Sequence, residues 1–318
     1  MITQPHVKVN LGLSVLRRRT DGYHDIETLF VPCHGFSDTL EIIAGDDWSE
    51  TSASLFARYA TSEVAQAIVP DGSLMVTIAR HGGVDWDPLN DLTARAYSLL
   101  ASDHKLPPMK IFLEKTSPVG AGLGGGSSDA AFALRMISEL AGLGLSDEAL
   151  AAYAARLGSD CAFFIYDRPM LGEGRGEILM PFDLDLTGFE LRVVVPEGIA
   201  VSTAEAYRGI VPREGACLDA AASEPGLPVP EESIPRKGSS LLSEGSRQSG
   251  GTGAATPLRE ALARPVSEWR GCLVNDFEAT VFAAHPALAS LKQSLYEQGA
   301  VYASMSGSGS ALFGLFPR

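Results

Sequence analysis

Five glycines occupy the seven positions from Gly120 to Gly126, and this run restricts the possible folds of the chain more than any other feature. Glycine has no Cβ, so the backbone here can adopt positive φ angles and approach a ligand closely. The run lies between an apolar stretch at 110–113, which predicts a strand, and an apolar periodic stretch at 127–141, which predicts a helix. Free N–H groups at a helix start favour anionic phosphates. We therefore predict a phosphate-binding loop at 118–131 rather than a merely flexible turn.

The loop does not fit two common phosphate-binding patterns. A Walker A loop places a lysine directly after its last glycine, whereas a serine follows here. The dinucleotide fingerprint is matched in spacing by Gly120, Gly122 and Gly125, but residues 115–118 separate the loop from its strand. The acidic residue that should end a second strand is also missing, because Glu139 falls within the predicted helix.

The segment from Val7 to Val15 alternates apolar and polar residues, which predicts a strand with one buried face. The core face is expected to carry Val7, Val9, Leu11, Leu13 and Val15, and the other face Lys8, Asn10, Gly12 and Ser14. Lys8 and Asn10 are therefore predicted to be neighbours on the same side. A turn is expected at 17–22.

Further strands and helices are predicted from periodicity. The strands are expected at 39–43, 75–79, 110–113, 191–195 and 311–316, and the helices at 91–100, 127–141, 146–156 and 287–298. Strict alternation of strand and helix is absent. The pattern favours an α+β fold with largely antiparallel or mixed sheets.

Three other groups of residues have the character of site residues. Residues 305–313 form a second turn of small residues before a strand, and this turn could close over the same phosphates. Asp160 precedes the apolar run 161–165, where a carboxylate needs a cation as partner. Tyr23 and His24 follow a turn and can stack on a ring or bond to its edge. Each group taken alone is more often structural: a tight turn, a cap, or a packed pair.

Composition limits the functional class. The chain has 25 Lys+Arg against 39 Asp+Glu, a formal net charge of −14, which argues against a general nucleic-acid binder. The 4 cysteines (Cys33, Cys161, Cys217 and Cys272) are scattered, so we expect free thiols and no structural zinc. Neither a signal peptide nor an apolar run long enough to cross a membrane is apparent. We expect a soluble cytoplasmic protein.

One stretch differs from the rest. Residues 212–256 contain no aromatic residue and are rich in Gly, Ser and Pro, which predicts a disordered surface insertion without a core of its own. A regulatory or partner-binding role for this stretch is the less favoured alternative.

Together, the 7–11 strand, the glycine loop 118–131 and the turn 305–313 resemble the GHMP small-molecule kinases from residue 7 to 316, apart from the insertion. The resemblance implies two α+β halves with the active site in the cleft between them. Residues 1–185 would form an N-terminal half like ribosomal protein S5 domain 2, and residues 186–318 a ferredoxin-like C-terminal half. The motifs 21–24, 157–160 and 172–177 most resemble the branch that phosphorylates the 2-hydroxyl of a cytidine diphosphate-linked methylerythritol in non-mevalonate isoprenoid synthesis.

The resemblance also implies roles for individual residues. Lys8 and Asp160 would be catalytic, with Asp160 as base or as an electrostatic positioner, and the substrates would be ATP with Mg²⁺ and a small-molecule alcohol. The implied ATP-binding residues are Pro118, Gly120, Gly122, Leu123, Gly124, Gly125, Gly126, Ser127, Ser128, Asn90 and Lys115, the last two lining the adenosine pocket. The implied substrate-binding residues are Asn10, Tyr23, His24, Thr203, Tyr207, Gly307 and Gly309, with the cytosine in an aromatic sandwich whose ring edge His24 reads.

Two points stay open at the level of sequence. Ser127 or Ser128 could touch Mg²⁺, and no carboxylate ligand is evident; Ser127 or Ser128 is also the expected helix cap. The alternatives to this function are a kinase of the homoserine or mevalonate type, a nucleotide-binding module without catalysis, and a Rossmann oxidoreductase.

Overall fold

The computed structural model describes residues 1–45, 47–213 and 256–318. Helices and strands are mixed, and the described strands pair antiparallel except for β6 with β7. The predicted α+β class is therefore confirmed. The predicted insertion lies almost wholly outside the described residues, although Arg213, within its bounds, donates a backbone bond to Val15 and pairs with Asp276.

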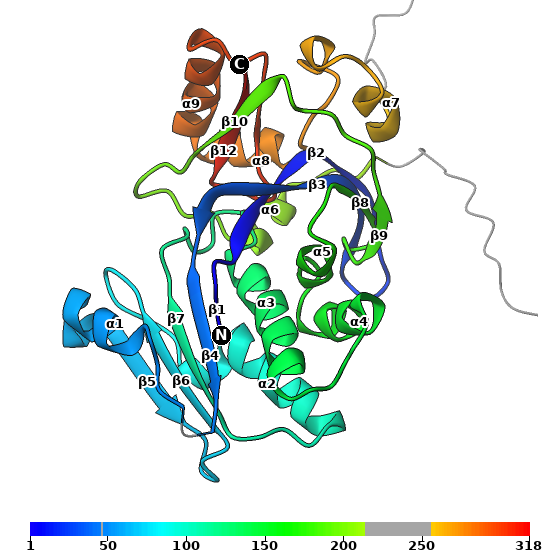
Figure 1. Ribbon diagram of the computed structural model, residues 1–318. Helices are drawn as coiled ribbons and strands as arrows, with labels where there is room; N and C mark the ends of the chain where they lie inside the picture. The colour runs from blue at the N-terminus through cyan, green and yellow to red at the C-terminus, as the bar shows by residue number, and fades with distance from the viewer. Residues whose placement is uncertain (46, 214–255) are drawn as a thin grey trace, which may run out of the picture.

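A five-stranded sheet forms one side of the molecule (Figure 1). Its order is β1 (Ile2–Thr3), β4 (Thr39–Ala44), β7 (Met109–Glu114), β6 (Leu74–Ala79) and β5 (Val64–Ile68). The parallel strands β6 and β7 are joined through α2 (Leu92–Asp103). One face of the sheet packs against α2 and α3 (Gly125–Leu140), and α1 (Ser52–Arg58) covers part of the other. Because side chains alternate along β4, Ile42 packs in the core on the α2 and α3 side of the sheet, and Ile43 packs in the core on the α1 side.

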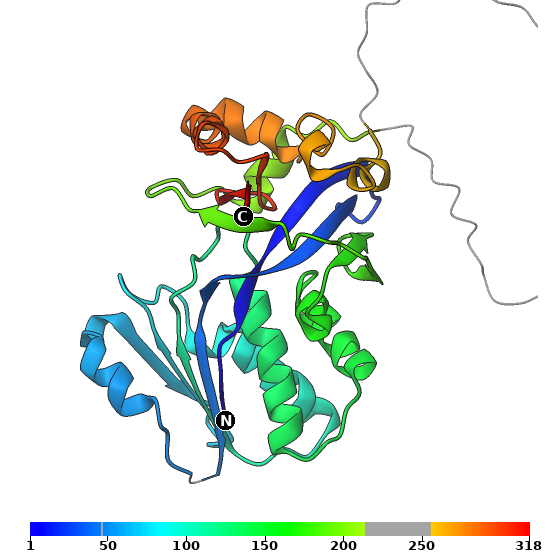
Figure 2. The ribbon, with the colours of Figure 1, turned by 45° about the horizontal axis from the view of Figure 1, so that its top comes forward.

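Two long antiparallel strands, β2 (His6–Arg18) and β3 (His24–Ser37), run from beside α3 toward the C-terminal half (Figures 1 and 2). They form a second sheet with β8 (Met170–Glu173) and β9 (Ile178–Pro181). The helices α4 (Asp147–Leu157) and α5 (Cys161–Tyr166) precede β8.

The predicted single buried face of β2 is wrong. Lys8 and Asn10, on the face expected to be open, are only 3% and 1% exposed, because the glycine loop and the C-terminal half pack against that face. The register also shifts between Leu11 and Leu13, where Gly12 has a φ of 67°. Residues before this bulge therefore pack in one core cluster and Leu13 packs in another.

The C-terminal half contains a three-stranded antiparallel sheet, and its helices lie above β10 in Figure 2. Its elements are β10 (Phe189–Val194), α6 (Thr203–Arg208), α7 (Leu258–Leu262), α8 (Phe277–Ala284), α9 (Pro286–Glu297), β11 (Tyr302–Met305) and β12 (Leu312–Pro317). Val9 of β2 packs in the same core cluster as Trp269 and Phe313. Because this core joins residues from both predicted halves, the boundary at 185/186 stays a prediction.

The predicted elements are all present, with ends shifted by three residues at most. Two local predictions are wrong. Arg17 and Arg18 continue β2 instead of beginning a turn. Helix α3 starts at Gly125 after Gly124, which has a φ of 71° and no side-chain cap, so Ser127 and Ser128 lie inside the helix and do not cap it. The sequence patterns did not predict the strands β1, β3, β5, β8, β9 and β11 or the helices α1, α5, α6, α7 and α8.

Three cysteines, Cys33, Cys161 and Cys272, are free thiols, as expected, and Cys217 lies outside the described residues. Within the described ranges, no helix combines the length and the apolarity that crossing a bilayer requires.

Candidate active site

A cavity of about 690 Å³ lies where the two predicted halves meet. The N-terminal half contributes residues of β2, the glycine loop and the start of α5, and the C-terminal half contributes residues of α6 and of the 305–313 turn. The lining includes Lys8, Asn10, Tyr23, His24, Gly120, Gly122, Gly124, Asp160, Thr203, Tyr207 and Gly307. The structure thus brings together both predicted catalytic residues, three loop glycines and most of the predicted substrate-binding residues.

Lys8 is the buried cation of this cavity. Its Nζ donates to Asn10 Oδ1 at 2.6 Å and to Gly122 O at 3.1 Å, and lies 3.1 Å from Asp160 Oδ2. These three acceptors match the three donors of an ammonium group. Asp160 immediately precedes α5 and its side chain is 30% exposed, so one carboxylate oxygen faces Lys8 while the group stays accessible. The predicted neighbourhood of Lys8 and Asn10 is confirmed.

The two turns of small residues are in direct contact. The Ser306 hydroxyl donates to Gly122 O at 3.0 Å, and Ala311 N donates to Ala121 O at 3.0 Å. A Cβ on Gly122 would lie 2.2 Å from Ser306 O, so only glycine fits there. Asn275, which the sequence reading missed, donates to Met305 O and Gly307 O from a buried position. A lone asparagine outside any motif gives no sequence signal for this bracing.

The glycine loop leads into the N-terminus of α3. The first intrahelical backbone bond runs from Ser128 N to Gly124 O, so the three preceding N–H groups are free of helical partners. Gly124 has a φ of 71°, which is strained for residues with a side chain, and a Cβ there would also lie 3.0 Å from Lys8 Cε. An anion at this helix start would therefore lie close to the Lys8–Asp160 pair, with the helix dipole in its favour.

The opposite end of the cavity is aromatic. His24 stacks on Tyr207 with ring centroids 4.5 Å apart, and Tyr207 meets Phe277 edge to face. His24 and Tyr207 are in direct contact, so there is no gap between them that would accept a third ring, as an aromatic sandwich would require. Burial, and secondarily Arg18, lower the pKa of His24, so its imidazole is neutral near pH 7 and offers both a donor and an acceptor. Burial raises the pKa of Tyr207 to about 12.

Several predicted ATP-binding and substrate-binding residues do not line the cavity. Leu123 is buried in the core, and its carbonyl accepts a backbone bond from Lys8 N at 2.9 Å. Gly309 belongs to the second turn, where a Cβ would lie 2.7 Å from the sulfur of Met305. The remainder, Pro118, Gly125, Gly126, Ser127 and Ser128, belong to the loop and the first turn of α3, and Asn90 is exposed just before α2.

Lys115 lies in a buried ion cluster beneath the loop. Its Nζ contacts Asp38 and donates to Asp129 Oδ2 at 2.6 Å, and the lysine side chain is 5% exposed. Asp38 also accepts bonds from Thr116 N and Ser117 N. Asp129 has one oxygen without a partner among the described residues, and burial raises its pKa. The cluster joins the end of β7 to the first turn of α3.

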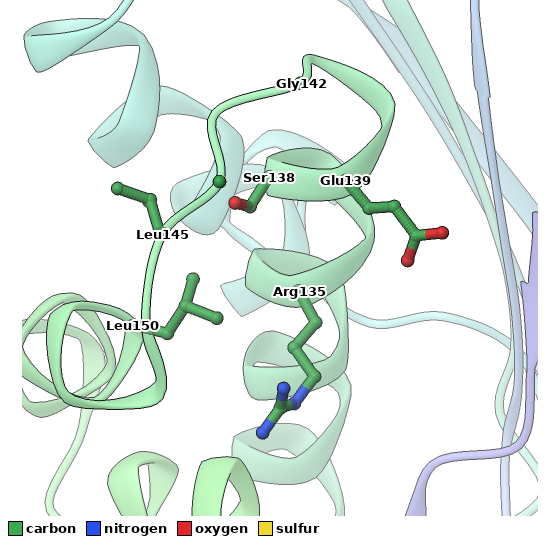
Figure 3. Close-up of a pocket in the computed structure, with 7 residues that line it drawn as sticks. Arg135, Ser138, Glu139, Gly142, Leu145 and Leu150 are labelled. Carbon is green, nitrogen blue, oxygen red and sulfur yellow. The ribbon is translucent and has the colours of Figure 1, made fainter.

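A smaller hollow at the other end of α3 does not offer comparable chemistry (Figure 3). Arg135, at its edge, is already engaged with Ile165 O and with Asp147. Figure 3 shows Glu139 on the last turns of the same helix, directed away from Leu145 and Leu150. Because Glu139 belongs to a helix and not to a strand end, the Rossmann interpretation of the glycine run has no structural support.

Two GHMP kinase sequence profiles match the chain. "GHMP kinases N terminal domain" matches residues 91–168 and "GHMP kinases C terminal" matches residues 258–318. A crystal structure of homoserine kinase from Cytophaga hutchinsonii has the same fold, with a TM-score of 0.55 at 14% identity over 98% of this chain and 85% of that one. The fold and the site together define a kinase of the GHMP class, with ATP as the co-substrate that this class implies.

More similar proteins narrow the class. A Bacteroides fragilis protein named 4-diphosphocytidyl-2-C-methyl-D-erythritol kinase is 38% identical over 99% of this chain and 92% of its own length. A crystal structure of 4-(cytidine 5'-diphospho)-2C-methyl-D-erythritol kinase aligns with a TM-score of 0.63 at 30% identity, covering 99% and 90% of the two chains. The chain belongs to the 4-diphosphocytidyl-2-C-methyl-D-erythritol kinase family. These relatives do not support the alternative of a homoserine- or mevalonate-type kinase.

Proposed function

We propose that this kinase transfers the γ-phosphoryl group of ATP to the 2-hydroxyl of 4-diphosphocytidyl-2-C-methyl-D-erythritol, a step in making isoprenoid precursors. The observation that carries the proposal is the convergence of Lys8 Nζ and Asp160 Oδ2, 3.1 Å apart, beside the start of α3. A phosphate site and a carboxylate–ammonium pair thus adjoin within one cavity. The names of the relatives supply the substrate.

The reaction follows from this arrangement. The acceptor hydroxyl oxygen attacks the γ-phosphorus, the bond from that phosphorus to the β-phosphate oxygen breaks, and ADP leaves. Asp160 receives the hydroxyl proton or orients it, while Lys8 stabilises the charge on the transferring group. The Asn10 and Gly122 acceptors hold Lys8 in place for this task. Most of the rate enhancement comes from alignment and charge neutralisation.

ATP is expected to place its phosphates against the glycine loop and the free N–H groups of α3. Among the described residues no group of three or more His, Cys, Asp or Glu side chains could hold a metal ion. The buried Ser128 hydroxyl has no partner among the described residues, and this fits a site that supplies one or two hydroxyls while phosphate oxygens and water supply the other ligands. We propose Ser127 or Ser128 as the contact for Mg²⁺, which would neutralise phosphate charge when bound.

The cytosine is expected at the aromatic end, near Tyr23, His24 and Tyr207. The neutral His24 imidazole can bond to the ring edge, and the direct stack of His24 on Tyr207 implies that the base binds beside this pair unless the two rings separate. Thr203 and Gly307 line the cavity nearby, and Thr203 Oγ1 is 3.2 Å from Ser308 Oγ. Free thiols and ATP use make the cytoplasm the proposed location.

A coupled ADP-release assay with ATP, Mg²⁺ and the cytidyl substrate tests the function, alongside homoserine and mevalonate as competing acceptors. Turnover only with homoserine or mevalonate, or with none of the three, would reject the proposal. Asp160→Asn should lower kcat by about 10²–10⁴-fold without changing the melting temperature appreciably. The matched control is Asp85→Asn, at a carboxylate whose side chain is 85% exposed, and this variant should keep full activity.

A further inference from the structure

Arg175 occupies the tight turn between β8 and β9, at the edge of the cavity. Its neighbours Gly174 and Gly176 have φ angles of 70° and 110°, and Gly174 O accepts a bond from Ile26 N at 2.6 Å. This bond fastens the turn to β3 two residues after His24. The position of Arg175 relative to the aromatic end is therefore set by backbone contacts and not by a loose loop.

The guanidinium of Arg175 has open donors. It lies 5.1 Å from the ring centroid of Tyr23, and its Nε is 3.5 Å from Glu177 Oε1. Neither of its two terminal nitrogens forms a hydrogen bond or ion pair with the described residues. Asp21, whose charge interacts with Arg175, is already bound by Arg19 at 2.9 Å. Arg175 therefore places two terminal nitrogens with free N–H donors in the cavity lining.

The other cation in the lining cannot supply such donors. Lys8 has three acceptors around its ammonium, one of them the Asp160 carboxylate. Lys8, Asp160 and Arg175 are the charged residues of the lining, so two cations face one carboxylate there, and Glu177, the partner of Arg175 Nε, lies outside the lining. A planar guanidinium fork matches the oxygens of a phosphate group, and its delocalised charge is less strongly hydrated than an ammonium.

We propose that Arg175 binds the diphosphate of the cytidyl substrate through its two terminal nitrogens and thereby selects the diphosphate-linked substrate over the nucleoside. This inference rests on the proposed function. The diphosphate joins the cytidine, expected near Tyr23 and His24, to the alcohol, expected near Lys8 and Asp160. Arg175 lies beside Tyr23 in the same cavity, where a phosphate attached to that cytidine comes within its reach.

The test compares binding of CDP, CMP and cytidine by calorimetry to the wild type, Arg175→Met, Arg175→Lys and the control Arg168→Met. Methionine keeps an apolar stem and removes the fork, lysine keeps the charge, and Arg168 is an exposed arginine outside the cavity lining. We expect Arg175→Met to weaken CDP binding about 10–100-fold and to leave cytidine binding unchanged. Arg175→Lys should be intermediate, and Arg168→Met should behave as wild type.

Kinetics complete the test. In Arg175→Met the KM for the cytidyl substrate should rise by a similar factor, while the KM for ATP and kcat stay within about twofold. Equal loss for CDP and cytidine would assign Arg175 to the base, a raised KM for ATP would assign it to the other nucleotide, and no change would leave it without a role; each overturns the inference. If the wild type distinguishes CDP from cytidine through Arg175 but turns over no cytidyl substrate, the proposed function fails while the binding site stands.

Discussion

Replacing Lys115 by methionine tests whether the buried cluster beneath the glycine loop is structural. The family resemblance implies that Lys115 lines the adenosine pocket, whereas the structure encloses its ammonium between the carboxylates of Asp38 and Asp129. All three side chains are at most 5% exposed. The substitution would leave two carboxylates of like charge in a site with little access to water.

The expected cost follows from that geometry. Removing one partner of a buried ion pair costs about 3–5 kcal/mol, because the remaining charge is left uncompensated. Asp38 keeps bonds from two backbone N–H groups, so Asp129, whose pKa burial already raises, is expected to take up a proton and limit the loss. Because the entropy of unfolding grows with chain length, 1 kcal/mol corresponds to roughly 1.5 °C for 318 residues, and the melting temperature should fall by about 5 °C.

Urea denaturation of four proteins measures the effect: wild type, Lys115→Met, Asp129→Leu and the double variant. Because the double variant removes the ammonium together with one carboxylate, it should recover about 1–3 kcal/mol relative to the sum of the single losses. The KM for ATP of folded Lys115→Met should stay within about threefold of wild type. A loss of stability below about 1 kcal/mol together with a strongly raised KM for ATP would refute this reasoning and return Lys115 to the adenosine pocket.

Two further predictions concern packing and pH. Gly122→Ala should destabilise the protein by about 2–5 kcal/mol in urea denaturation, because its Cβ would overlap Ser306 O and its φ is 78°. The control Gly120→Ala has a similar φ of 71° but no atom within 4 Å of the added Cβ, so it should cost only about 1–2 kcal/mol. Equal losses would contradict the contact between the two turns. His6 lowers the pKa of Asp167 from a distance of 2.8 Å, so the carboxylate stabilises the fold above its unfolded pKa and loses this effect as pH falls through the lower folded value. Asp167→Asn should therefore melt below wild type at pH 7 and approach it below about pH 4, and a gap independent of pH would speak against a charge effect.

Much of the local structure could be read from the sequence. The alternation from Val7 to Val15 gave a strand and made Lys8 and Asn10 neighbours, since side chains two apart share one face of a strand. The glycines between a strand and a helical run gave the turn that opens α3. These inferences depend on short-range sterics and periodicity, which operate whatever the rest of the chain does.

Where local signals were weak or conflicting, the prediction failed. The bulge at Gly12 interrupts an alternation that the residues themselves show without a break, because partner strands and the C-terminal half decide the register. Helix α3 starts earlier than the serines suggested, since the positive φ of Gly124 ends the loop in place of a side-chain cap. The role of Lys115 in ATP binding stays a prediction, whereas its two carboxylate partners, Asp38 and Asp129, are distant in sequence and left no local signal.

The sequence by itself determined several element types and the chemical groups available: a glycine-rich loop, an ammonium on a strand, and a carboxylate before an apolar run. Only the tertiary structure decided that Lys8, Gly122 and Asp160 meet, that Asn275 braces the second turn and that Arg175 keeps free donors in the cavity. The reason is that such meetings depend on the packing of elements distant along the chain. Burial and the balance of charge in a shared volume fix that packing, and no single segment encodes either.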